Sequence, residues 1–93
     1  MKEAKKIVYL DYAATTPVAP EVIKAMQPFL SEEFGNPGSF NTLGMRARDA
    51  VDAARATIAQ ILHTKTSEII FTAGGTESIN LAIKGIVRGN KEK

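Results

Sequence analysis

The sequence predicts a mainly helical chain with one or two short strands. Apolar residues recur at spacings of three and four over residues 43–62 and again over residues 76–88, which is the period of an amphipathic helix. The run Glu68–Thr72 is instead rich in Ile and Phe and is bounded by turn residues, which favours a strand. The apolar run at residues 7–10 is long enough for a second short strand or an extended arm.

The first part of the chain predicts an arm, a broken helix and a loop. Residues 1–19 are interpreted as an N-terminal extended arm. Apolar positions then follow a helical period over residues 20–33, where Pro20 suits the first turn because its missing N–H does no harm there. Pro28 lies inside this pattern, and we expect it to kink or end the helix. The run 35–39 is dense in Gly, Asn and Pro, and we expect a loop there.

Composition excludes several classes of protein. The chain of 93 residues is 44% hydrophobic and 24% charged, which is an ordinary globular balance. Its net charge of +2 comes from interleaved signs, and the N-terminal lysines lack base-stacking aromatic neighbours, so we expect no nucleic-acid partner. The chain has no cysteine, which excludes disulfides and thiolate metal sites, and we expect no metal. Without a signal-peptide pattern or an apolar run near the ~20 residues of a membrane span, we expect a soluble, cytoplasmic protein without a membrane partner.

His63 is the only histidine and falls at the end of the helix predicted over residues 43–62. An imidazolium at this position complements the negative end of the helix dipole. We therefore interpret His63 as a cap or surface residue, and we name no catalytic residue in the chain.

The glycine turn (Ala73–Gly75) is the element best suited to chemistry. Backbone N–H groups in the first turn of a helix lack intrahelical partners, and with the helix dipole they favour a phosphate. Glycine lets the backbone approach such a ligand closely, and Thr76 and Ser78 add hydroxyl donors. Many Gly-Gly turns bind nothing, so a plain structural turn stays open as the alternative. The glycine spacing fits neither a dinucleotide fingerprint nor a Walker loop.

Three motifs stand in order along the chain. They are Tyr-Leu-Asp-Tyr-Ala-Ala-Thr-Thr-Pro at residues 9–17, Phe-Gly-Asn-Pro-Gly-Ser at 34–39, and Glu-Ile-Ile-Phe-Thr-Ala-Gly-Gly-Thr-Glu-Ser-Ile-Asn-Leu-Ala-Ile-Lys-Gly at 68–85. Each motif alone is weak, but three at these separations are specific. Over residues 8–88 the chain resembles the N-terminal part of the cysteine desulfurases, which are pyridoxal-phosphate enzymes of the class V aminotransferase group.

The resemblance implies an α/β parent: a large domain with a mostly parallel sheet, as in the PLP-transferases, and a smaller domain, assembled as a homodimer. Residues 20–93 would be an incomplete, N-terminal part of the cofactor-binding domain. Such enzymes take sulfur from L-cysteine as an enzyme persulfide and leave L-alanine. They pass the sulfur to iron–sulfur scaffolds or other acceptor proteins, for iron–sulfur clusters and thio-cofactors.

The same likeness implies which residues meet the cofactor. The phosphate of pyridoxal 5'-phosphate would bind at Gly75 and Thr76, and the Asp11–Thr16 arm and the Asn36–Ser39 loop would run near the mouth of the site. Two departures leave subgroup and substrate preference open. Phe-Asn-Thr at residues 40–42 stands where the family loop often continues through a second serine to a histidine. Ile79 stands where Asn or Asp is common.

The family's Schiff-base lysine, ring-stacking histidine, pyridine-binding aspartate and persulfide cysteine lie beyond this length. We therefore expect the 93-residue chain alone to be inactive, to bind the cofactor weakly or not at all, and to self-associate through its apolar stripes. Two alternatives stay open: a standalone non-catalytic interaction or assembly module, and a segment of a selenocysteine lyase or another class V enzyme.

Overall fold

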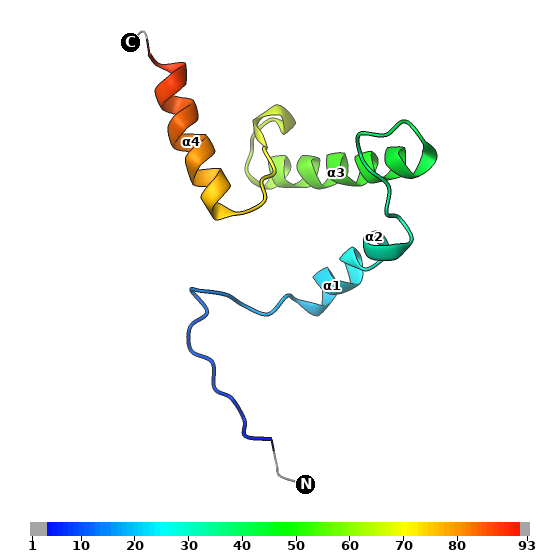
Figure 1. Ribbon diagram of the computed structural model, residues 1–93, viewed down its shortest axis with the longest axis vertical. Helices are drawn as coiled ribbons and strands as arrows, with labels where there is room; N and C mark the ends of the chain where they lie inside the picture. The colour runs from blue at the N-terminus through cyan, green and yellow to red at the C-terminus, as the bar shows by residue number, and fades with distance from the viewer. Residues whose placement is uncertain (1–3, 92–93) are drawn as a thin grey trace. The chain divides into compact units, whose positions relative to one another are not determined.

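The computed structural model describes residues 4–91 as helices joined by turns and extended segments (Figure 1). The elements are α1 (Pro20–Met26), α2 (Pro28–Ser31), α3 (Thr42–Ile61), the short 3-10 turn η1 (Thr66–Glu68) and α4 (Gly75–Gly89). The mainly helical character that the sequence predicts is confirmed. The chain divides into two units, of which the first ends at Arg48 and the second begins at Asp49.

Pro28 divides the helix predicted over residues 20–33 into α1 and α2. The N–H of Gln27 still donates to the carbonyl of Ile23 at 3.0 Å, so helical bonding reaches the residue before the proline. Pro28 has no N–H to continue the series, and a new helix begins at this residue. The break that the sequence predicts is therefore confirmed.

The expected strands do not form among residues 4–91, which corrects that part of the prediction. Glu68 ends η1, and Ile69 has extended backbone angles of φ −98° and ψ 122°. The extended shape therefore follows local propensity. A strand also needs ladder hydrogen bonds to a neighbour, and the described residues supply no neighbour for Ile69–Thr72 or for residues 7–10.

The loop after α2 is held against the start of α3 within the first unit. A Cβ added to Gly44 would lie 2.4 Å from the carbonyl oxygen of Ser39, and one added to Gly35 would lie 2.1 Å from that of Leu43. Only glycine fits at such close backbone crossings. The side-chain oxygen of Asn41 caps α3 by accepting the N–H of Gly44 at 2.8 Å.

His63 ends α3 in a left-handed conformation, with φ 53°. Its N–H donates to the carbonyl of Gln60 at 3.2 Å, and the N–H of Thr64 donates to that of Ala59 at 2.9 Å. These two bonds form a Schellman motif, in which glycine usually occupies the position of His63. The interpretation of His63 as a cap residue is confirmed.

Very little apolar surface is buried within residues 4–91. The buried residues are small: Gly44, Ala47 and Ala59. On α4, Ile79 is 61% exposed and Ile86 is 67% exposed. Because an amphipathic helix is stabilised by covering its apolar stripe, α4 needs a surface that the described residues do not provide.

Candidate functional site

The candidate site is the N-terminal end of α4, which follows the glycine turn. Gly74 is the N-cap residue with extended backbone angles of φ 168° and ψ −179°, and Gly75 is the first helical residue. Among residues 4–91, no hydrogen-bond acceptor meets the N–H groups of Gly75, Thr76 or Glu77. Three backbone donors at the positive end of the helix dipole are thus available to an anion.

The two glycines leave open space at this end of the helix. A Cβ added to Gly74 or Gly75 would meet no other heavy atom within 4 Å, and neither residue has a left-handed φ. The turn itself therefore does not require glycine, unlike the close crossing at Gly35. The open space fits a ligand, or a neighbouring segment, that approaches the backbone.

A small hydrogen-bonded network braces the turn from inside. The hydroxyl oxygens of Thr72 and Ser78 lie 2.6 Å apart. The carbonyl oxygen of Gly74 accepts from the Ser78 backbone N–H at 3.1 Å, with the Ser78 hydroxyl also 3.1 Å away. Ser78, which the sequence offers as a ligand donor, is therefore engaged within the turn. The hydroxyl of Thr76 has no hydrogen bond within the described chain, which leaves it for a ligand.

Glu77 brings a negative charge to the same end of α4. Its Oε2 accepts the N–H of Ala73 at 2.9 Å, which caps the turn and complements the helix dipole. Glu77 is acidic, and the first turn of α4 carries no basic residue. A tight hold on a phosphate at this end therefore needs positive charge from outside the first turn.

The other two segments that the resemblance places near a site belong to the first unit. In the arm, the N–H of Ala14 donates to the carbonyl of Asp11 at 3.0 Å and closes a turn. In the loop, Asn36 Oδ1 accepts the N–H of Gly38 at 2.8 Å. Both segments are locally ordered, and their place near Gly75 and Thr76 stays a prediction.

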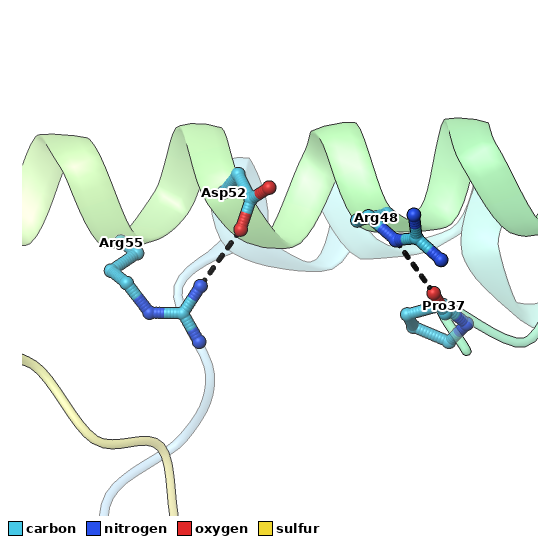
Figure 2. Close-up of polar contacts among 4 residues, drawn as sticks. All are labelled: Pro37, Arg48, Asp52 and Arg55. Atoms are coloured by element: carbon cyan, nitrogen blue, oxygen red, sulfur yellow. Dashed lines mark hydrogen bonds and ion pairs between the residues drawn. The ribbon is translucent and has the colours of Figure 1, made fainter. Parts of the chain in front are cut away.

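Arg48 of α3 holds that loop (Figure 2). Its Nε donates to the carbonyl of Pro37 at 2.9 Å. The guanidinium carbon also lies 5.6 Å from the centre of the Phe40 ring, which is the distance of a cation–π contact. Helical periodicity places Arg48 only on the polar side of α3, so the sequence does not indicate this contact.

Residues 4–91 hold no group of three or more His, Cys, Asp or Glu side chains arranged to bind a metal ion. Within the same residues, no helix combines the length and apolar character needed to cross a membrane.

Glu68 anchors the connector between α3 and the glycine turn. Its Oε2 accepts the hydroxyl of Thr64 and the N–H of Lys65, the latter at 2.8 Å. The Thr64 bond, and then the Lys65 bond, hold the pKa of Glu68 below its usual value of 4.5.

We expect the connector to lose order in acid, because ionised Glu68 accepts both bonds more strongly than its protonated form does. A lowered pKa means that the contribution to stability is present above pH 4.5 and is lost as the pH falls through the lowered folded value. Carboxyl chemical shifts measured during an NMR titration test this expectation. Thr64→Val should move the pKa of Glu68 upward, and titration of the unsubstituted chain at or above 4.5 would contradict the assignment.

Comparison with known proteins defines the class. Residues 8–93 match the family model for class-V aminotransferases. The chain therefore belongs to the class-V aminotransferase family.

Its relatives are cysteine desulfurases, as the motifs predict. The chain is 57% identical over 82 residues to cysteine desulfurase IscS of Dictyoglomus turgidum, covering 88% of this chain and 21% of that protein. It is 49% identical over 88 residues to cysteine desulfurase IscS of Methanosarcina thermophila, covering 95% of this chain and 22% of that protein. A solved structure of a NifS-like protein matches 91% of this chain and 23% of its own, at a TM-score of 0.85 and 38% identity. The chain thus spans about a fifth of the length of the curated relatives it matches.

Proposed function

We propose that this chain is part of a pyridoxal-phosphate-dependent cysteine desulfurase, a sulfurtransferase that converts L-cysteine to L-alanine and an enzyme persulfide. The observation that carries the proposal is the 57% and 49% identity to proteins named cysteine desulfurase, over most of this chain. The segment's own share of that activity is the phosphate-binding end of α4.

Gly75 and Thr76 would hold the phosphate of pyridoxal 5'-phosphate. Their N–H groups have no partner within residues 4–91, the Thr76 hydroxyl is uncommitted, and the glycines leave space for close approach. The residues present therefore fit the group. When bound, the cofactor supplies an electron sink for carbanion chemistry, while this segment binds and orients its phosphate.

The remaining parts of the proposal follow from the family. Residues 1–19 would be an arm, and residues 20–93 an incomplete part of the cofactor-binding domain, in a cytoplasmic homodimer. Sulfur would pass to an iron–sulfur scaffold or another acceptor protein. The segment alone would be inactive, because it has no cysteine to carry a persulfide. It would bind the cofactor weakly or not at all, because Glu77 lies at the phosphate end and the first turn of α4 has no cation.

The test is to express a longer reading frame that contains this segment and to supply L-cysteine, pyridoxal 5'-phosphate and a thiol reductant. We expect L-alanine and sulfide in equal amounts, and we expect neither from the 93-residue chain. Pyruvate and ammonia in place of alanine would contradict the proposed reaction, as would turnover of selenocysteine alone.

A further inference from the structure

We propose that Asp52 and Arg55 of α3 are positioning residues for the glycine turn, and that they act through the ring of Phe71. The proposal concerns the second unit alone and rests on the proposed function for its significance. None of these three residues is assigned a role by the motifs or by the helical pattern.

An ion pair with Asp52 orients the guanidinium of Arg55. Arg55 Nη1 donates to Asp52 Oδ1 at 2.8 Å, within one turn of α3 (Figure 2). The guanidinium carbon of Arg55 lies 5.1 Å from the centre of the Phe71 ring. A planar guanidinium that is held by a carboxylate can keep its face toward an aromatic ring, so Asp52 orients Arg55 and Arg55 holds Phe71.

The ring is joined directly to the network that shapes the turn. Phe71 precedes Thr72, whose hydroxyl oxygen lies 2.6 Å from that of Ser78. The Ser78 backbone N–H in turn donates to the carbonyl of Gly74 at 3.1 Å. A continuous series of contacts therefore runs from α3, through the ring, to the helix end that presents the free N–H groups.

Other restraints on this segment are few. Ile69–Thr72 has no ladder hydrogen bonds to another strand within the described residues. Phe71 remains 45% exposed, so burial alone holds its ring weakly. The guanidinium of Arg55, whose side chain is only 29% exposed, lies over the ring, and in this proposal that contact helps to hold the ring and hence the start of the turn.

The experiment is NMR of the 93-residue chain with Arg55→Met, Asp52→Asn and Phe71→Leu. In the unsubstituted chain, the side-chain protons of Arg55 should show the upfield shift of protons above an aromatic ring. Asp52→Asn and Phe71→Leu, which keep Arg55, should remove that shift. All three substitutions should speed amide exchange at Ser78 about two- to fivefold, the value of a partly exposed cation–π contact. Phe71→Tyr keeps the aromatic face and should restore both readouts. Arg88→Met, which removes a cation from the last turn of α4, should change neither.

Two outcomes separate this inference from the proposed function. An unshifted Arg55, or Ser78 exchange that is unchanged in Arg55→Met and Phe71→Leu, overturns the positioning role even if the longer protein is a desulfurase. Faster Ser78 exchange with rescue by Phe71→Tyr supports the positioning role even if the longer protein does not bind pyridoxal 5'-phosphate. Failure of the longer protein to bind pyridoxal 5'-phosphate would count against the proposed function alone.

Discussion

Gly75→Val in the longer protein is expected to weaken the binding of pyridoxal 5'-phosphate by about ten- to a hundredfold. The added side chain would fill the open space at the end of α4, which the phosphate must enter to reach the N–H groups of Gly75 and Thr76. Losing a hydrogen bond to a charged group costs about 1.5–3 kcal/mol, which gives this range. Cofactor titration of the apo-protein, followed by imine absorbance, measures the dissociation constant.

The matched control lies on the same helix. Gly85 is also in α4, and a Cβ added there would meet no other heavy atom within 4 Å. Gly85→Val should therefore leave cofactor affinity unchanged within about twofold, and circular dichroism of the longer protein checks that this variant folds. Thr76→Val removes one hydroxyl at nearly constant shape and should cost about tenfold. Unchanged affinity in Gly75→Val would exclude the proposed phosphate contact.

The second large effect is association of the 93-residue chain with itself. The described residues leave most of their large apolar side chains exposed, including Ile83 and Ile86 on α4. Covering one such side chain is worth about 1.5–3 kcal/mol, so contact between apolar stripes is strongly favoured in water. Light scattering should give a mass above that of the monomer, rising with concentration.

Substitutions on α4 identify the surface that associates. Ile83→Glu together with Ile86→Glu should lower the mass toward that of the monomer, because charge within an apolar contact is costly to desolvate. Lys84→Gln changes charge on the same helix without removing an apolar group and should have little effect. A monomer that unfolds cooperatively at high concentration would contradict self-association.

The sequence predicts the helices well because their determinants are local. The periodicity over residues 43–62 and 76–88 gives α3 and α4 to within a residue at each end. The missing N–H of Pro28 places the break between α1 and α2. The prediction of a strand at Glu68–Thr72 is wrong, because its determinants are not all local. Local propensity sets an extended backbone, but a ladder of hydrogen bonds requires a partner strand.

The candidate site is predictable only in part. The sequence brings Gly75 and Thr76 to the first turn of α4, where the structure finds both. The sequence does not show that the Ser78 hydroxyl points toward the carbonyl oxygen of Gly74, because that direction depends on the side-chain rotamer of Ser78. The contact between Arg55 and Phe71 joins residues separated by η1 and its flanking turns, so no periodic pattern marks it.

A crystal structure of the longer protein with pyridoxal 5'-phosphate bound tests the central claim most directly. We predict phosphate oxygens about 3 Å from the backbone nitrogens of Gly75 and Thr76 and from the Thr76 hydroxyl, at the open end of α4. A phosphate held elsewhere, with these donors bonded to protein or to bulk water, would contradict the claim.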